Sequence, residues 1–221
     1  MSRMPDNFVD MTVTSPPYNI GGKSMSVGKY YDKYSDDLNN LEYRNFLYTT
    51  IDNLLRISKY YVFFNFQILS GNKDVYLQLL SDFKSNIKDI IIWNKQAVAQ
   101  IQKGKMATGY EFIIILGHDN KMKFDYNNFP DNNYVPNIQT WFKKESIKGH
   151  GATMPINMAR YFIMNFSNRN DIIYDPFMGT GTTGCAAAIE SRNWIGSEIS
   201  TDYVDLANKR IDKYLNQTKL F

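Results

Sequence analysis

The chain has 221 residues, of which 43% are apolar and 15% aromatic, and its formal net charge is +3. This apolar content can bury one sizeable core, which excludes wholesale disorder and favours a single domain over residues 1–221. No run of 18 apolar residues is present, and the first residues lack the apolar stretch of a secretory signal. We therefore expect a cytoplasmic protein that neither spans a membrane nor is secreted. With one cysteine and two histidines, we expect no internal disulfide and no metal site.

The positive charge is concentrated in one central stretch. Residues 95–150 carry eight lysines and five acidic residues, so their surplus of three equals the net charge of the whole chain. The same stretch contains Trp141, Phe142 and Tyr126 among many asparagines and glutamines. A basic, aromatic and amide-rich surface suits nucleic acid, although an ordinary lysine-bearing surface has the same composition.

The apolar pattern predicts strands and helices that alternate along the chain. A short buried strand at 10–14 stops before Pro16 and Pro17, and a polar loop with three glycines follows at 20–40. The remaining expected elements are a helix (42–58), an apolar strand (60–66), a helix (73–83), two strands (89–93, 111–116), an irregular segment (117–149), a helix with Pro155 in its first turn, a strand (171–175), a helix (182–190), a strand (193–198) and a helix (202–215). Such alternation, with strands apolar on both faces, predicts an α/β fold with a doubly wound, mainly parallel sheet.

The sequence Asp-Pro-Phe-Met-Gly-Thr-Gly-Thr-Thr, residues 175–183, joins a predicted strand to a predicted helix. Open α/β sheets bind ligands at such a junction, where Gly179 and Gly181 let the backbone approach closely. The helix N-terminus favours a carboxylate or phosphate, and Asp175 can accept hydrogen bonds from an ammonium group. Glu198, at the end of the next predicted strand, is placed to hold ribose hydroxyls. These features fit S-adenosylmethionine; the alternative is a glycine turn needed only for packing.

A second motif, Thr-Ser-Pro-Pro-Tyr at residues 14–18, follows the first predicted strand. Its two prolines fix the backbone and remove two amide donors. The Ser15 hydroxyl and the Pro16 carbonyl can both accept hydrogen bonds from one amino group, and Tyr18 offers a flat face on which a base can stack. A rigid turn without a catalytic role is an equally open interpretation of this motif alone.

Together the two motifs resemble those of the DNA amino-methyltransferases, which methylate an exocyclic nitrogen of adenine or cytosine. Their order, with Ser-Pro-Pro-Tyr first, is similar to the beta class of that family, and the resemblance extends over nearly the whole chain. Other matching segments are residues 93–95, 110–111 and 194–198 and, at His150, Thr153 and Pro155, a segment that precedes a cofactor-holding helix.

The resemblance implies a Rossmann-like methyltransferase fold with S-adenosylmethionine as cofactor, S-adenosylhomocysteine as product and double-stranded DNA as substrate. Catalytic roles are implied for Ser15, Pro16, Pro17 and Tyr18. Cofactor-binding roles are implied for Asp175, Phe177, Gly179, Gly181, Thr182, Thr183, Glu198, Thr153 and Pro155. In DNA binding we expect the lysines to contact phosphates, namely Lys23, Lys29, Lys103, Lys105, Lys143 and Lys144.

The resemblance leaves several points open. Ser-Pro-Pro-Tyr favours cytosine N4 slightly over adenine N6, but both targets occur with this spelling. Members usually begin with one more strand and a Gly-Asp before the segment matched here by residues 5–10, so we expect one edge strand and one adenine contact to be absent. The short target-recognition segment, about 117–149, is compatible with a homodimer, and a cognate restriction endonuclease acting on the same site is compatible with the family. The alternatives are an RNA methyltransferase and a non-catalytic or partner-dependent DNA-binding subunit.

Overall fold

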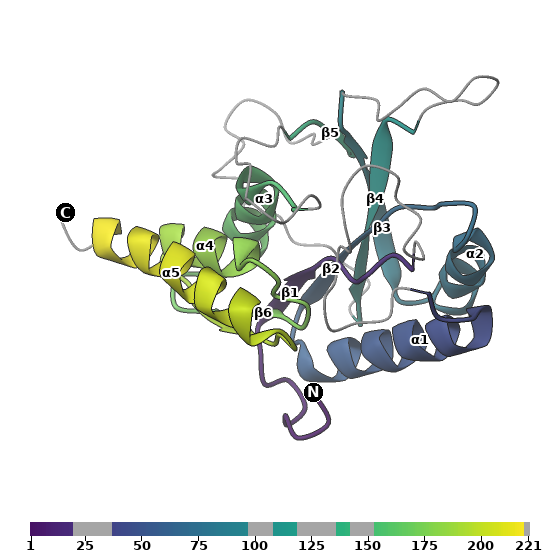
Figure 1. The fold of residues 1–221 in the computed structure, drawn as a ribbon, viewed down its shortest axis with the longest axis horizontal. Coiled ribbons are helices and arrows are strands. Elements are labelled where there is room, and N and C mark those ends of the chain that lie inside the picture. Colours follow the sequence, from purple (N-terminus) through teal and green to yellow (C-terminus); the bar gives the residue numbers. More distant parts are fainter. Residues whose placement is uncertain (20–36, 97–107, 119–135, 142–152, 219–221) are drawn as a thin grey trace.

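The computed structural model describes residues 1–19, 37–96, 108–118, 136–141 and 153–218 (Figure 1). Helices and strands alternate along most of the chain, as the sequence predicts. In chain order the elements are β1 (Met11–Thr14), α1 (Asn40–Ile57), β2 (Tyr61–Phe66), α2 (Lys73–Asp82), β3 (Ile87–Asn94), β4 (Tyr110–Gly117), β5 (Ile138–Gln139), α3 (Ile156–Phe166), β6 (Ile172–Asp175), α4 (Thr182–Ile189), β7 (Asn193–Gly196) and α5 (Thr201–Thr218).

The strands of the described residues form one sheet in the order β5-β3-β4-β2-β1-β6-β7. Parallel pairs join β1 to β2 and to β6, β6 to β7, and β3 to β5, whereas β4 is antiparallel to both β2 and β3. The predicted mainly parallel sheet is thus confirmed. Since β4 alone is reversed, its amino end lies at the same edge as the carboxyl ends of the other strands.

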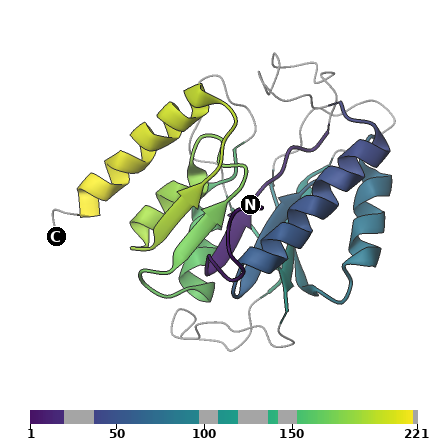
Figure 2. The ribbon, with the colours of Figure 1, turned by 90° about the horizontal axis from the view of Figure 1, so that it is seen from below.

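Helices cover both faces of this sheet, α1 and α2 on one side and α3, α4 and α5 on the other (Figures 1 and 2). On the first face, Leu47 and Leu54 of α1 are buried against Phe64 of β2. On the second, the rings of Phe63 and Phe162 stack with centroids 4.4 Å apart. Each such side chain contributes roughly 1.5–3 kcal/mol when fully buried, so the two layers hold the sheet and fix its edges in place.

Three details differ from the sequence-based expectations. Helix α1 begins two residues earlier, because Asn39 and Glu42 form a capping box in which each side chain accepts the other's backbone N–H, at 3.0 and 3.2 Å. Pro155 is the cap residue before α3 rather than part of its first turn. The short strand β5 lies within the segment expected to be irregular.

Three further findings concern membrane spans, metal ligands and the cysteine. Among the helices that the structure describes, none is long and apolar enough to cross a membrane. The described part of the chain holds no group of three His, Cys, Asp or Glu side chains that could bind a metal ion. Cys185 is fully buried in α4, where it packs as a small apolar residue.

Candidate active site

The two sequence motifs meet at the carboxyl edge of the sheet. Residues 15–18 follow β1 directly, and residues 176–181 connect β6 to α4. Because β1 and β6 are paired neighbours, the two segments start side by side. The hydroxyl of Thr14 donates a hydrogen bond to Oδ1 of Asp175 at 2.6 Å, which joins the last residues of the two strands directly.

The turn after β1 is held in place by hydrogen bonds that side chains donate to its backbone carbonyls. Pro16 and Pro17 are buried, while Ser15 and Tyr18 are partly exposed. The Pro17 carbonyl accepts a hydrogen bond from the Tyr43 hydroxyl at 2.8 Å, and Asn72 Nδ2 donates to the Tyr18 carbonyl at 2.7 Å. Since the prolines also restrict φ, the turn presents the Ser15 and Tyr18 side chains in one fixed arrangement.

The strand register explains why polar side chains gather beside Ser15. In the parallel pair of β1 and β2, Ser15 and Asn65 are the next residues after the last registered pair, so they lie on the same face. Asn65 stands opposite Ile113 across the antiparallel pair of β2 and β4. Glu111, two residues from Ile113, shares that face because side chains alternate along a strand. Residues from β2, from β4 and from the turn after β1 are thereby brought to one point.

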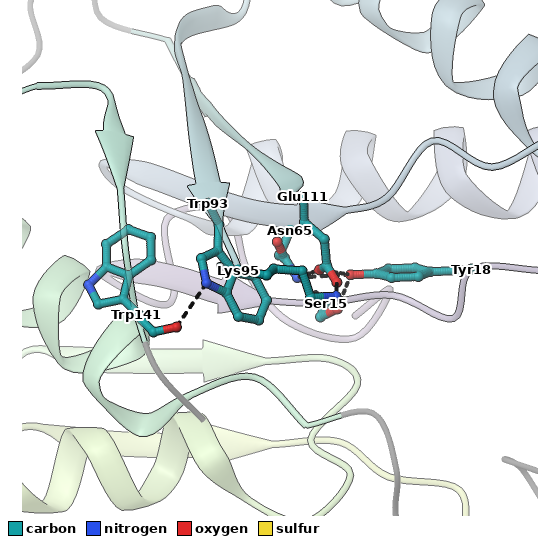
Figure 3. Close-up of polar contacts among 7 residues, drawn as sticks. All are labelled: Ser15, Tyr18, Asn65, Trp93, Lys95, Glu111 and Trp141. Atoms are coloured by element: carbon teal, nitrogen blue, oxygen red, sulfur yellow. Dashed lines mark hydrogen bonds and ion pairs between the residues drawn. The ribbon is translucent and has the colours of Figure 1, made fainter. Parts of the chain in front are cut away.

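These side chains form a hydrogen-bond network, shown in Figure 3. The Tyr18 hydroxyl lies 3.0 Å from Ser15 Oγ and donates to Glu111 Oε2 at 2.9 Å. Asn65 Nδ2 donates to Tyr18 Oη at 2.8 Å and to Glu111 Oε2 at 2.9 Å, and it lies 3.4 Å from Ser15 Oγ. A carboxylate only accepts, so the Asn65 amide must turn its nitrogen towards Glu111. Asn65 and Glu111 are only 3% and 6% exposed, and the network supplies partners for Asn65 Nδ2 and for both Glu111 oxygens. Asn65 Oδ1 is buried without a hydrogen-bond partner among the described residues.

The other oxygen of Glu111 forms an ion pair. Lys95 Nζ lies 2.5 Å from Glu111 Oε1 and 5.2 Å from the centroid of the Trp93 ring. Trp93 is itself fixed, because its Nε1 donates to the Trp141 carbonyl at 3.0 Å. Lys95 is thus held by a carboxylate on one side and an aromatic face on the other, so its charge is directed into the site (Figure 3).

The glycine segment after β6 has the tight backbone that the sequence predicts. Gly181 has a φ of +81°, in the left-handed region that favours glycine. A Cβ at Gly181 would lie 2.8 Å from Cβ of Ala207 in α5, closer than such atoms approach. Gly181 therefore serves both the turn and the close packing of α5 against it.

Asp175 is the last residue of β6, and its buried carboxylate accepts three hydrogen bonds. Oδ1 accepts hydrogen bonds from Thr14 and from the Phe177 amide at 3.0 Å, and Oδ2 accepts one from the Thr183 hydroxyl at 2.9 Å. Burial raises the pKa of Asp175 to about 6, although these hydrogen bonds act in the opposite direction. Asp175 thus links β1, the glycine segment and the first turn of α4.

Glu198, beyond the end of β7, closes the glycine segment from the other side. Its Oε2 accepts a hydrogen bond from the Gly179 amide at 2.8 Å, and Oε1 accepts from the amides of Ile199 and Ser200 at 2.8 and 2.9 Å. Backbone amides therefore fix the orientation of this carboxylate at the sheet edge.

The other predicted site residues are less tightly gathered. The Phe177 ring packs beside Phe46 of α1, with centroids 5.6 Å apart, and Thr182 is the buried first residue of α4. Thr153 and Pro155 lie at the amino end of α3, which packs against α4. All the lysines expected to contact phosphates lie outside the described residues: Lys23, Lys29, Lys103, Lys105, Lys143 and Lys144.

Sequence reasoning missed three members of this site: Asn65, Lys95 and Glu111. A signal for two of them was available. Asn65 is the polar residue in the otherwise apolar strand β2, and Glu111 is an acid buried at the start of an apolar strand. The approach of Glu111 to Tyr18 depends on the reversed direction of β4, which the apolar pattern does not contain.

Comparison with known proteins assigns the family. A model of the N6 and N4 methyltransferases, described as DNA methylase, matches residues 9–209. The chain belongs to this DNA methylase family. The resemblance noted from the sequence is therefore confirmed, as is the methyltransferase type of fold.

Curated relatives carry DNA-modification names. The type II methyltransferase M.HpaI of Haemophilus parainfluenzae is 24% identical over 236 residues, covering 98% of this chain and 72% of that protein. M.HinfI of Haemophilus influenzae is 27% identical and covers 96% of this chain and 65% of its own length. The orphan methyltransferase M.BamHII of Bacillus amyloliquefaciens is 47% identical over 66 residues, which are 30% of this chain and 25% of that protein. The chain thus covers less than two thirds of two of these three relatives.

Solved structures share the fold. The PvuII cytosine-N4-specific DNA methyltransferase superposes with a TM-score of 0.72 at 17% identity, covering 98% of this chain and 87% of that one. The complex of M1.HpyAVI with S-adenosylmethionine gives 0.63 at 23% identity, covering 96% and 90%. At these identities the two structures establish a shared architecture.

Proposed function

We propose that this chain transfers the methyl group of S-adenosylmethionine to an exocyclic amino group of a base in double-stranded DNA, with cytosine N4 slightly favoured over adenine N6. The hydrogen bond between Thr14 and Asp175 is the observation that carries the proposal, because it joins the turn at residues 15–18 to the glycine segment. Membership of the DNA methylase family supports DNA as the substrate. The Ser-Pro-Pro-Tyr spelling supports cytosine.

The residues at the glycine segment fit this cofactor by the chemistry of their acceptors. Asp175 and Glu198 each receive three hydrogen bonds from described residues, which use three of the about four lone-pair positions of a carboxylate. Each can accept one more, from an ammonium group at Asp175 and from a ribose hydroxyl at Glu198. Both donors belong to S-adenosylmethionine, whose sulfonium supplies the reactive methyl group when it is bound.

On the base side, the chain's part is to align and polarise the amino group. The lone pair of an exocyclic amino nitrogen is delocalised into the ring, which makes it a poor nucleophile. Ser15 Oγ and the Pro16 carbonyl would accept its two hydrogens and favour a pyramidal, more nucleophilic nitrogen. This stabilises the transition state without a covalent intermediate. The Tyr18 ring would stack on the base and hold its plane.

A base inside a duplex cannot reach this site, so it must leave the helix at a cost of a few kcal/mol. Stacking on Tyr18 would return about 1–3 kcal/mol of that cost. The expected phosphate contacts of the lysines would hold the DNA while the base is displaced.

The test measures transfer of the tritium-labelled methyl group from S-adenosylmethionine to PCR-amplified, unmethylated genomic DNA. An RNA transcript of the same sequences is assayed in parallel as a second substrate. We expect label in DNA from the wild type and a loss of at least about 10²-fold with Ser15→Ala. Label in RNA instead would identify an RNA methyltransferase. Cofactor binding without transfer to either would support a non-catalytic or partner-dependent subunit.

A further inference from the structure

The direction of each hydrogen bond around Tyr18 follows from the groups involved. Glu111 Oε2 can only accept, so the Tyr18 hydroxyl donates its one hydrogen to Glu111. The 3.0 Å contact between Ser15 Oγ and Tyr18 Oη must then have Ser15 as its donor. With its own proton directed at Tyr18, Ser15 can only accept on the side that faces a bound base. Glu111 thus sets the polarity of a residue that it does not touch.

The remaining contacts hold this polarity in place. Asn65 Nδ2 donates to both Tyr18 Oη and Glu111 Oε2. Because it only donates, it takes no proton from Tyr18 and leaves the direction of the Tyr18–Glu111 and Ser15–Tyr18 bonds unchanged. Lys95 donates to Oε1 and keeps the carboxylate directed at Tyr18 through Oε2. Hydrogen bonds thus link Lys95, Glu111, Tyr18 and Ser15 in series, from the end of β3 and the start of β4 to the turn after β1 (Figure 3).

From this geometry we infer that Glu111 is a positioning residue for methyl transfer, which orients Ser15 as an acceptor and takes up the proton that the amino nitrogen loses. The inference rests on the proposed function. It concerns residues that are not part of either sequence motif.

The proton count of the step balances along the chain. The amino nitrogen forms its bond to the methyl carbon while the carbon–sulfur bond breaks and its electron pair stays on sulfur. The nitrogen then carries a positive charge and releases one proton to Ser15 Oγ. Ser15 passes its own proton to Tyr18 Oη, and Tyr18 passes its proton to Glu111 Oε2. One proton has moved from the base to the carboxylate, and both hydroxyls are restored.

The experiment compares single-turnover methyl transfer to PCR-amplified, unmethylated genomic DNA by the wild type, Glu111→Gln, Tyr18→Phe and the double variant. Tyr18→Phe keeps the aromatic face and removes the bridging hydroxyl. We expect each single variant to slow transfer by about 10²-fold, with cofactor affinity unchanged. The double variant is expected to be no slower than either single variant, because Glu111 acts through Tyr18. Glu190→Gln, which breaks the 2.6 Å ion pair with Arg160 outside the site, is the matched control and should transfer at the wild-type rate.

Wild-type transfer with an undiminished rate in Glu111→Gln overturns the inference and leaves the proposed function standing. Effects that multiply in the double variant also overturn it, since Glu111 would then act independently of Tyr18. If the slower transfer by Glu111→Gln is matched by an equal loss of folded protein, measured by circular dichroism, Glu111 has only a structural role. Absence of transfer by the wild type itself overturns the proposed function and the inference with it.

Discussion

Thr14 and Asp175 are 161 positions apart in the chain and are joined by a buried hydrogen bond of 2.6 Å between their side chains. Thr14 immediately precedes the turn proposed to hold the base, and Asp175 immediately precedes the segment proposed to hold the cofactor. Methyl transfer requires the nitrogen, methyl carbon and sulfur to be aligned, and small displacements are costly. We infer that this bond fixes the spacing between the two halves of the site.

Thr14→Val removes the donor while keeping the shape of the side chain. Because Asp175 loses one partner in a buried position, we expect a loss of about 1–3 kcal/mol in the free energy of unfolding, measured by urea denaturation. The single-turnover transfer rate should fall as well. Thr49→Val, at an exposed position of α1, is the control and should change stability little. Equal stability of the two variants would show that the bond contributes nothing.

Stability should depend on pH through Asp175. Its pKa is raised to about 6 by burial, above the ordinary value of an unfolded aspartate. Between about pH 4 and pH 6 the folded state therefore holds a proton that the unfolded state has released, so the free energy of unfolding falls as pH rises through this window. The expected loss is roughly 3 kcal/mol. Subtracting the profile of Asp175→Asn isolates this contribution; a difference that is flat or rises with pH contradicts it.

Gly181→Ala should destabilise the protein more than Gly184→Ala. The first places a side chain at a φ of +81° and 2.8 Å from Ala207 Cβ, and each effect costs about 1–3 kcal/mol. At Gly184, inside α4, the new Cβ meets the flexible end of Ile211 at 2.6 Å, and alanine favours the helix by about 1 kcal/mol. Thermal unfolding and cofactor affinity should rank the two variants in this order. The reverse order would refute the packing role assigned to Gly181.

DNA affinity should fall steeply with salt if the lysines neutralise phosphates. Each neutralised phosphate contributes a slope of about −0.9 in the logarithm of affinity against the logarithm of salt concentration. Replacing Lys143 and Lys144 by alanine should make the slope shallower by about 0.9 for each phosphate that is no longer neutralised. Lys213→Ala, exposed on α5, should leave it unchanged. A salt-independent affinity in the wild type would contradict the predicted phosphate contacts.

The fold was largely predictable because its strands are buried on both faces. All six residues of β2 are buried, and so is all of β1, so their apolar runs could be recognised without knowledge of their partners. The glycine segment was also recognisable, since a strand, two glycines and a helix follow one another within a few residues. The Thr14–Asp175 bond was not predictable, because it depends on which strands become neighbours.

The contribution of Glu111 was hidden for a related reason. An acid at the start of an apolar strand could equally be a solvated strand end, and only the reversal of β4 brings it to Tyr18. The contribution of Lys95 could not be predicted from the charge pattern either. It is one of eight lysines in a basic stretch of the sequence, yet it forms an ion pair inside the site.

The central claim is that an amino group of a DNA base receives the methyl group. It is tested most directly by nucleoside mass spectrometry of unmethylated DNA incubated with the protein and isotopically labelled S-adenosylmethionine, with Ser15→Ala in parallel. We predict labelled N4-methylcytosine, or N6-methyladenine in its place, at a level that disappears with Ser15→Ala. DNA nucleosides that stay unlabelled at both amino groups, despite measurable binding of the cofactor, would contradict the proposal.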